Sequence, residues 1–258
     1  MRPTSGAVAI IPARLQSTRL SEKPLQDLGG APLVVRVWER ARQAASLDSI
    51  WVATDSEPIA ASVRRAGGNA LLTRPDHPSG LDRVAEAASL LETAADSIIL
   101  NVQGDEPFLN PAGLDQLVRL FDRPEVRMAT LAAPFLAGDD PSDPNRVKVV
   151  VDRTGRALYF SRAPIPYGSG GEVPLLLHVG IYAYRLATLR ELAALPPAPL
   201  ERAERLEQLR ALWNGIQIHV AVGDYHSIGI DTPEDLVRAR LRWEADGEGK
   251  ITKGGVGR

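Results

Sequence analysis

Three cations lie in one short loop near the start of the chain, where their charge and spacing suit a polyphosphate ligand. Arg14, Arg19 and Lys23 follow the apolar run 7–11, which is predicted to be a buried strand. Folds with a parallel sheet bind ligands beyond the carboxyl ends of the strands, and cations gathered there neutralise an anion. Loop arginines and lysines are by default solvated, but the position after the first strand favours a triphosphate-binding loop.

Two aspartates have a comparable position and are candidate metal ligands. Asp105 follows the apolar run 98–102, and Asp231 follows the run 227–230. Mg²⁺ prefers a few carboxylates completed by water and substrate oxygens, so the pair suits magnesium ions that bridge phosphate groups. The alternative is that each aspartate caps a helix.

For Asp231 the capping alternative is weakened by the residues that follow it. Thr232 is a good N-cap, Pro233 suits the first helical position, and Asp235 is placed for a capping box. The helix therefore does not need Asp231, whose carboxylate stays available for a ligand.

A second polar cluster, with Arg74 and Arg83 at its ends, precedes and begins another predicted helix. Ser79 and Gly80 stand just before that helix, so the hydroxyl group and the free backbone amides there can bind a base or a phosphate. Capping of the helix alone explains Ser79 equally well.

The second half of the chain offers weaker candidates. Arg162 follows a predicted strand, and His178 and Tyr182 share one face of another strand by a period of two. Arg162 and His178 could hold a carboxylate together, although a lone histidine on a strand is more often structural. Glu207 and Gln208 are predicted in the middle of a helix, where a solvated face is the default and the pattern alone does not select them.

The elements that position these residues change character along the chain. Strands are predicted at 7–11, 50–53, 70–72 and 98–102, and they alternate with helices at 32–45, 58–66 and 81–93. This alternation indicates a parallel sheet covered by helices. From residue 128, extended runs follow one another without helices and indicate antiparallel pairing, with a hairpin turn at 152–155. These runs are 128–134, 146–151, 156–160 and, further on, 178–184.

The last part of the chain completes an α/β fold. Helices are predicted at 186–195, from the proline cluster through Trp213, and at 233–243, with extended segments at 216–222 and 227–230. The expected fold is a mostly parallel, doubly wound, Rossmann-like sheet with an inserted smaller antiparallel subdomain. We expect one domain over 1–245 and a flexible tail over 246–258.

Composition excludes several classes of partner. The chain has 258 residues, of which 44% are hydrophobic, and its 30 basic and 32 acidic residues give a net charge of -2. No global positive field favours nucleic acid or an anionic membrane. The chain has no cysteine, so metal ligands must be oxygen or imidazole. The apolar run before Pro12 is too short for a signal peptide or a membrane span. We expect a cytoplasmic protein with no membrane or nucleic-acid partner.

Taken together, the motifs resemble the 3-deoxy-manno-octulosonate cytidylyltransferases, the CMP-Kdo synthetases. The matching segments are 10–25, 52–55, 74–83, 101–107, 157–163, 178–185, 206–213 and 230–236. Sugar-nucleotide pyrophosphorylases have a Gly-Gly-rich first loop, and sialic acid cytidylyltransferases become Gly-rich after Pro-Ala-Arg. Neither pattern fits the residues at 17–25 of this chain.

The resemblance implies a nucleotidyltransferase that moves CMP from CTP to the anomeric hydroxyl of 3-deoxy-D-manno-octulosonate (Kdo), with release of pyrophosphate, for lipopolysaccharide biosynthesis. It also implies Mg²⁺ as cofactor and a homodimer. The segment 7–125 would bind nucleotide, 126–223 would bind the sugar and dimerise, and 224–245 would bring a metal aspartate and the closing helix.

The resemblance also assigns residues to each role. The catalytic residues would be Arg14, Lys23, Asp105 and Asp231, the last two as metal ligands. The nucleotide would be bound by Pro12, Ala13, Arg14, Arg19, Lys23, Arg74, Ser79, Gly80, Arg83 and Gln103. The sugar acid would be bound by Gln103, Arg162, His178, Tyr182, Glu207 and Gln208.

Two departures from the family pattern concern the substrates. Leu81 stands where the family usually has Thr or Ser, and Leu177 stands where it usually has Lys or Arg. A related ulosonic acid is therefore an alternative acceptor. A nucleotide-binding protein without turnover would be expected to lose a metal aspartate, and a glycosyltransferase would usually carry Asp-x-Asp where this chain has Gly104-Asp105-Glu106.

Overall fold

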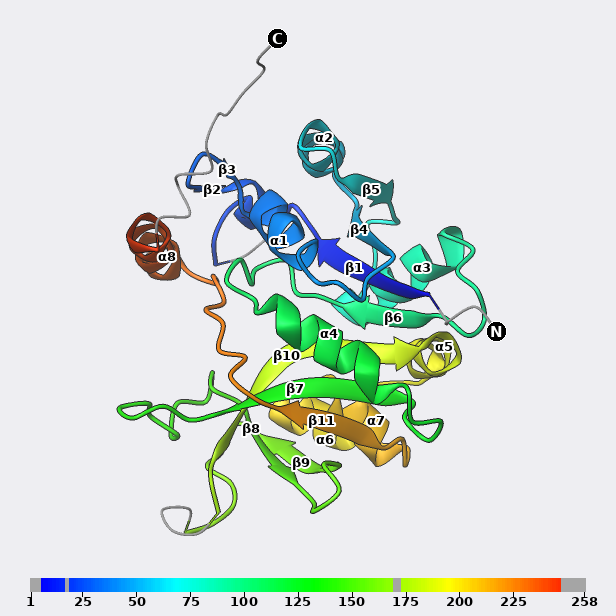
Figure 1. The fold of residues 1–258 in the computed structure, drawn as a ribbon, viewed down its shortest axis with the longest axis vertical. Helices are drawn as coiled ribbons and strands as arrows, with labels where there is room; N and C mark the ends of the chain where they lie inside the picture. The colour runs from blue at the N-terminus through cyan, green and yellow to red at the C-terminus, as the bar shows by residue number, and fades with distance from the viewer. Residues whose placement is uncertain (1–5, 17–18, 169–172, 247–258) are drawn as a thin grey trace.

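The computed structural model describes residues 6–16, 19–168 and 173–246. Its centre is one mixed β-sheet with the strand order β11-β7-β10-β6-β1-β4-β5, from which the hairpin of β8 and β9 branches beside β10. Helices cover both faces of this sheet (Figure 1). The predicted α/β class is confirmed, and the antiparallel strands prolong the parallel sheet.

The parallel half holds the strands whose carboxyl ends were predicted to form the site. It consists of β1 (Ala7–Ala13), β4 (Ser49–Thr54), β5 (Asn69–Leu72) and β6 (Ile98–Asn101). Ala9 in the middle of β1 pairs with Ile50 on one side and Leu100 on the other. Strands buried on both faces need continuous apolar runs, which is why the central strands β1 and β6 were visible in the sequence.

Two hydrophobic cores separate the sheet from its helices. One face packs against α1 (Leu33–Ala41), α2 (Glu57–Arg65) and α4 (Pro111–Leu120). The other face packs against α3 (Gly80–Leu90), α5 (Leu186–Ala194) and α7 (Leu209–Trp213). Helix α4 was not predicted.

The antiparallel half is built from the strands of the second half of the chain. These are β7 (Met128–Pro134), β8 (Lys148–Val151), β9 (Ala157–Ser161), β10 (Leu176–Arg185) and β11 (Ile218–Val222). Strand β10 is antiparallel to both β6 and β7, whereas β11 is parallel to β7. The predicted turn between β8 and β9 is confirmed: Asp152 N–H donates to the Arg156 carbonyl at 2.8 Å, and Gly155 has a positive φ of 80°.

Helix α8 (Pro233–Ala245) packs against a short hairpin of β2 (Asp27–Leu28) and β3 (Ala31–Pro32). The ring of Trp243 lies against the hairpin turn, where a Cβ on Gly29 would stand 2.2 Å from the indole nitrogen. Gly29 also has a positive φ of 61°, so glycine is required there for two reasons. This contact brings the last helix next to the first loop of the chain (Figure 1).

Three sequence predictions need correction or fall outside the described residues. The helix expected to continue through Trp213 is two helices, α6 (Pro199–Glu204) and α7, because Arg205 adopts a left-handed conformation with φ of 54°. The extended segment predicted at 227–230 is not a strand. Ser17, Thr18 and almost all of the predicted tail lie outside the described residues.

Candidate active site

The first loop and the two predicted aspartates meet at the carboxyl edge of the parallel strands. Lys23, at the start of the short 3-10 helix η1 (Lys23–Leu25), donates from Nζ to Asp105 Oδ2 at 2.6 Å and to Asp231 Oδ1 at 2.8 Å. Arg19 Nη2 lies 3.1 Å from the same oxygen of Asp231. We call these four residues the cation-carboxylate cluster. It joins segments far apart in the sequence, since Lys23 and Asp231 are separated by 208 positions.

Asp231 reaches the cluster because the chain before α8 is pinned to the end of β6. The Ile230 N–H donates to the carbonyl of Asp105 at 3.0 Å. The predicted capping box is confirmed: Thr232 Oγ1 accepts from Asp235 N–H at 3.2 Å, and Asp235 Oδ2 accepts from Thr232 N–H at 2.9 Å. The carboxylate of Asp231 takes no part in the cap and stays free to face Lys23.

The cluster is partly shielded from water, which strengthens its internal attraction. The side chain of Lys23 is 15% exposed, against 27% for Asp105 and 43% for Asp231. Burial by itself lowers the pKa of Lys23, but its attraction to and hydrogen bonds with Asp105 and Asp231 outweigh that effect and raise the pKa. Lys23 therefore stays charged at neutral pH.

Glu106 is a member of this region that sequence reasoning missed. Burial, together with repulsion by Asp105, raises the pKa of its carboxyl group to about 7. Its Oε2 atom is buried without a hydrogen-bond partner among the described residues. The signal was its position beside Asp105 after β6, which sequence analysis used only as an argument against a glycosyltransferase.

A cavity of about 320 Å³ opens beside the cluster. We call it the larger cavity. It is lined by Pro12, Ala13, Arg14, Gln16, Arg19, Lys23, Pro24, His77, Pro78, Ser79, Gly80, Arg83, Gln103, Gly104, Asp105 and Asp231. Gly104 lets the ends of β1 and β6 approach here, because a Cβ at this position would lie 2.9 Å from the Pro12 carbonyl oxygen. Eleven of the twelve residues predicted for the nucleotide or the metal line this cavity.

Ser79, Gly80 and Arg83 reach the cavity from the beginning of α3. Ser79 caps the helix by accepting from Asp82 N–H at 3.3 Å, and its hydroxyl donates to Asp82 Oδ2 at 2.7 Å, so both predicted roles of this residue are compatible. Arg83 is buried and donates to Thr73 Oγ1 at 2.6 Å and to Asp55 Oδ2 at 3.0 Å. These contacts fix the guanidinium at the cavity wall.

Arg74 is the exception among the predicted nucleotide residues. Its side chain is 66% exposed, and its Nε lies 3.3 Å from Glu86 Oε1. It does not line the larger cavity. His77, which was not predicted, lines the cavity instead and forms a close contact with Glu86 Oε2.

A smaller cavity of about 10 Å³ lies between β10 and the turn that joins α6 to α7. Its walls include the predicted residues Tyr182, Glu207 and Gln208, together with Leu81 and Tyr184. Glu207 and Gln208 lie in that turn and not in the middle of a helix, which corrects their predicted setting. Burial raises the pKa of Glu207, and the nearby Ser79 of the larger cavity partly opposes this.

Gln103 joins the larger cavity to strand β10. It lines that cavity, and its Nε2 donates to the carbonyl of Gly180 in β10 at 3.1 Å. This contact ties the segment after β6 to the strand that carries Tyr182, and the role of Gln103 toward both substrates stays a prediction.

His178 and Arg162 are not brought together as a carboxylate-binding pair. His178 Nε2 lies 3.0 Å from Thr130 Oγ1, between the rings of Phe160 and Tyr182, and burial lowers its pKa to about 3. It is therefore neutral at physiological pH, and it lines neither cavity.

The guanidinium of Arg162 is occupied by backbone carbonyl groups. It donates to the carbonyls of Glu204 and Pro144, both at 2.8 Å, and of Arg205 at 3.2 Å. Arg162 also lines neither cavity. In this structure it holds the chain around the end of α6, a role that its position after a strand could not reveal.

Comparisons with known proteins agree with this geometry. The family model described as cytidylyltransferase matches residues 8–218. A 3-deoxy-manno-octulosonate cytidylyltransferase of Sodalis glossinidius is 48% identical over 243 residues, which cover 91% of this chain and 96% of the relative. The protein of the same name from Syntrophobacter fumaroxidans is 51% identical over 234 residues, covering 89% and 93%.

Solved structures show the same likeness. A structure of CMP:2-keto-3-deoxy-manno-octonic acid synthetase complexed with CTP matches with a TM-score of 0.88 and 42% identity, covering 94% of this chain and all of that chain (100%). A 4-diphosphocytidyl-2C-methyl-D-erythritol synthase from Anaerococcus prevotii shares the fold at 14% identity, with a TM-score of 0.61 and coverage of 93% and 97%. The sequence match covers nearly the whole chain, and the fold that carries the cation-carboxylate cluster matches as well. This chain therefore belongs to the 3-deoxy-manno-octulosonate cytidylyltransferase family.

Proposed function

We propose that this protein transfers CMP from CTP to the anomeric hydroxyl of Kdo, yielding CMP-Kdo and pyrophosphate. The observation that carries the proposal is the convergence of Arg19, Lys23, Asp105 and Asp231 at the edge of a cavity large enough for a nucleotide. Nucleotidyl transfer depends mainly on positioning and on neutralisation of charge, so no protein nucleophile is needed. The relatives named for this reaction support the choice of CTP and Kdo.

Different residues of the larger cavity would bind different parts of CTP. Arg14, Arg19 and Lys23 lie on the side of the first loop, where they would bind the phosphates and stabilise the departing pyrophosphate. Ser79 and Gly80 begin α3 on the opposite side and would contact the base and ribose with the hydroxyl and the free amides of the helix.

Asp105 and Asp231 would hold Mg²⁺. The donor set fits, because both carboxylates already converge on one cation, the Lys23 ammonium group, and Glu106 adds a buried oxygen without a partner beside them. Among the described residues no group of three or more His, Cys, Asp or Glu side chains is arranged for a metal, so further ligands would come from phosphate oxygens and water. When bound, the ion supplies additional positive charge for the transferring phosphate.

The sugar acid would lie beside the residues around the smaller cavity, which at about 10 Å³ has room for no more than one polar group of the sugar. Tyr182 borders this cavity from β10, and Glu207 and Gln208 border it from the turn between α6 and α7, while Gln103 lines the larger cavity. Hydroxyl groups of a sugar are matched by amide, carboxylate and phenol groups. The hydrogen bond from Gln103 to the Gly180 carbonyl of β10, the strand that carries Tyr182, supports a sugar site beside the nucleotide cavity, as transfer between two substrates requires.

Measurement of pyrophosphate release tests the proposal. The four nucleoside triphosphates are assayed with Mg²⁺ against Kdo and related ulosonic acids, and turnover is expected with CTP and Kdo. Faster turnover of another ulosonic acid would assign a different acceptor, in keeping with Leu81 and Leu177. Absence of turnover with every sugar would overturn the proposal.

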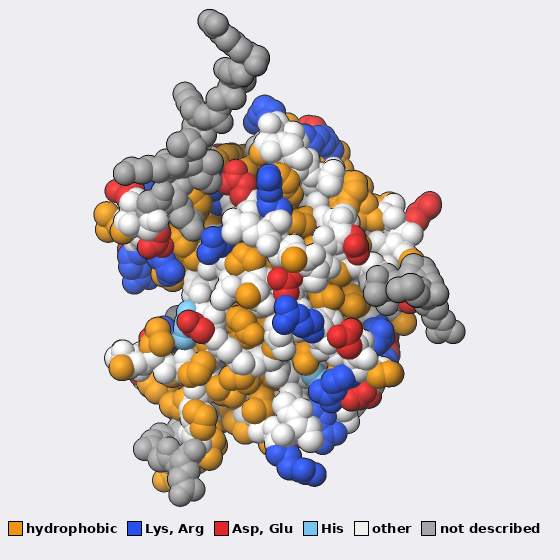
Figure 2. Space-filling view, viewed as in Figure 1, with side chains coloured by type: hydrophobic (Ala, Val, Ile, Leu, Met, Phe, Trp, Pro, Cys, Tyr) orange, Lys and Arg blue, Asp and Glu red, His pale blue; other side chains and the backbone are white. Residues whose placement is uncertain are grey.

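We also propose a homodimer that serves lipopolysaccharide biosynthesis, as the family resemblance implies. Large exposed hydrophobic side chains of the antiparallel half support an interface there; they include Leu136, Leu158, Val173 and Val222. Figure 2 shows hydrophobic side chains gathered on the side of the molecule where Figure 1 draws these strands. Light scattering on the purified protein tests the dimer.

Among the described residues no helix is long and apolar enough to cross a membrane.

A further inference from the structure

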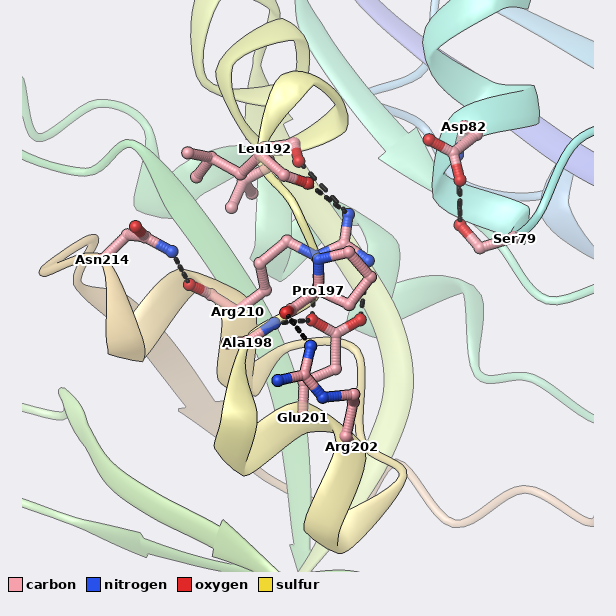
Figure 3. A network of polar contacts seen from close by, with 10 residues as sticks. Ser79, Asp82, Leu192, Pro197, Ala198, Glu201, Arg202, Arg210 and Asn214 are labelled. Atoms are coloured by element: carbon pink, nitrogen blue, oxygen red, sulfur yellow. Dashed lines mark hydrogen bonds and ion pairs between the residues drawn. The ribbon is translucent and has the colours of Figure 1, made fainter.

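Arg210 is a buried arginine behind the smaller cavity, and its side chain joins three helices. Its Nε and Nη2 donate to the two carboxylate oxygens of Glu201 at 2.9 and 2.6 Å. Its Nη1 lies 3.3 Å from the Leu192 carbonyl and 3.4 Å from the Leu195 carbonyl. Figure 3 shows the guanidinium between the helix that bears Leu192 and the helix that bears Glu201.

Glu201 extends this connection to the start of α6. Its Oε2 also accepts from the backbone N–H of Ala198 at 2.9 Å, so the carboxylate caps α6 while it binds Arg210. Both side chains are almost fully buried, at 7% exposure for Arg210 and 12% for Glu201. A buried ion pair is weak evidence for stability, but a two-pronged one defines the orientation of both partners.

The turn that carries Glu207 and Gln208 depends on this connection. Helices α6 and α7 have six and five residues, and helices this short are held by tertiary contacts and not by their own propensity. The backbone N–H of Arg210 donates to the carbonyl of Glu207 at 3.1 Å. Arg210 itself borders the smaller cavity next to Glu207 and Gln208.

Gln208 provides an independent observation that this turn belongs to a ligand-binding site. Its side chain is 6% exposed, and its Nε2 is buried without a hydrogen-bond partner among the described residues. Buried amide groups are normally hydrogen-bonded, because an unsatisfied one is costly. A polar substrate group in the smaller cavity would remove that cost.

We propose that Arg210 is a positioning residue for the second substrate. Through its pair with Glu201 it holds the turn at 205–208 so that Glu207 and Gln208 meet the sugar acid. The inference rests on the proposed function, because it assumes that the smaller cavity belongs to the acceptor. Among the described residues, no hydrogen bond or ion pair of Arg210 reaches Lys23, Asp105 or Asp231. We therefore expect substitutions of Arg210 to leave the affinity for CTP almost unchanged.

Two variants test this assignment, Arg210→Lys and Glu201→Gln. Lysine keeps the charge but cannot form the two-pronged contact, and glutamine keeps the shape of glutamate without its charge. We expect each variant to raise the KM for Kdo about ten-fold or more, because small displacements of binding groups are expensive. The KM for CTP should change by less than about two-fold.

Arg127→Lys is the matched control. Arg127 also joins α5 to the sheet, since its Nε lies 3.3 Å from Thr188 Oγ1 and its Nη2 contacts Glu191, but it is 48% exposed and lies outside both cavities. Both KM values of this variant should match those of the wild type. Thermal unfolding of all variants, and calorimetric titration of each with CTP, separate loss of folding from loss of acceptor binding.

The possible outcomes are distinct. If both KM values rise together, or if neither changes in Glu201→Gln, Arg210 has a structural role only and the inference is wrong. If Arg210→Lys does not fold, the KM values of Glu201→Gln decide whether the inference holds. If the wild type itself does not convert CTP and Kdo, the proposed function fails before the variants are compared.

Discussion

The two cavities of this protein are built in opposite ways. The larger one holds about 320 Å³ and is lined mainly by charged and polar groups that leave the ends of β1 and β6 or begin α3 and α8. The smaller one holds about 10 Å³ and is surrounded by aromatic and aliphatic side chains of β10, α3 and α7, with Glu207 and Gln208 on its rim. The first is open at the sheet edge, and the second lies inside the packing between sheet and helices.

The difference teaches where each kind of recognition comes from. Charge recognition at the sheet edge uses the ends of strands, which the fold brings together in any protein of this type. The proposed acceptor site borders two short helices that are held by buried contacts such as the pair of Arg210 and Glu201. Substitutions in the two regions should therefore have separable effects, and four experiments examine this separation.

The largest effect is expected from Asp105→Ala. Loss of this carboxylate removes a proposed metal ligand and one partner of Lys23, so turnover should fall by about 10³-fold or more. The measurement is pyrophosphate release, with circular dichroism to confirm that the variant is folded. Asp224→Ala is the control, since this side chain is 94% exposed. Retained activity in the Asp105 variant would remove it as a metal ligand.

A pair of substitutions tests directly whether CTP and Kdo are bound by separate groups of residues. Arg14→Ala should raise the KM for CTP about ten- to hundred-fold and leave the KM for Kdo unchanged, because it removes a charged partner of the phosphates. Glu207→Gln should do the reverse, with a rise of similar size for Kdo alone. Steady-state kinetics with each substrate varied in turn measures both. Equal changes in the two KM values for either variant would mean that the cavities do not act as separate binding regions.

Leu81→Thr tests whether Leu81 acts in the nucleotide site or beside the smaller cavity. Its sequence position beside Gly80 suggested a missing hydroxyl for the nucleotide, but its side chain is 3% exposed and borders the smaller cavity. The substitution should cost about 2 kcal/mol of unfolding free energy, because it removes buried apolar groups and buries a hydroxyl. Urea denaturation measures this cost. An altered KM for CTP would place Leu81 in the nucleotide site after all.

The smallest effect concerns the pH dependence of stability. His178 has a folded-state pKa of about 3, below its unfolded value, so between these values the unfolded chain binds more protons and stability falls as the pH falls. From pH 7 to pH 5 the wild type should lose about 1 to 2 kcal/mol more than His178→Gln. Denaturant unfolding at both pH values tests this. Equal losses would mean that His178 is not held neutral by its apolar surroundings.

Sequence reasoning succeeded where the position of a residue follows from its neighbours in the chain. Asp105 and the first loop come directly after apolar strands, and the capping box at Thr232 and Asp235 left Asp231 available. It failed where local pattern is ambiguous. Glu207 and Gln208 had the spacing of a continuous helix, but the left-handed Arg205 ends α6 before them. Arg162 and His178 make contacts with backbone carbonyls and aromatic rings that the local pattern did not reveal, and their role as sugar ligands stays a prediction.

The sequence by itself determined the α/β fold, the family and the loop of cations, because buried strands and the turns after them are encoded within a few neighbouring residues. Only the tertiary structure decided that Lys23 stands between Asp105 and Asp231, and that Glu106 joins them with a pKa near 7. Only it placed Arg210 beside Glu207 and Gln208 at the smaller cavity. The physical reason is that burial, charge pairing and the arrangement of short helices depend on contacts between segments far apart in the chain.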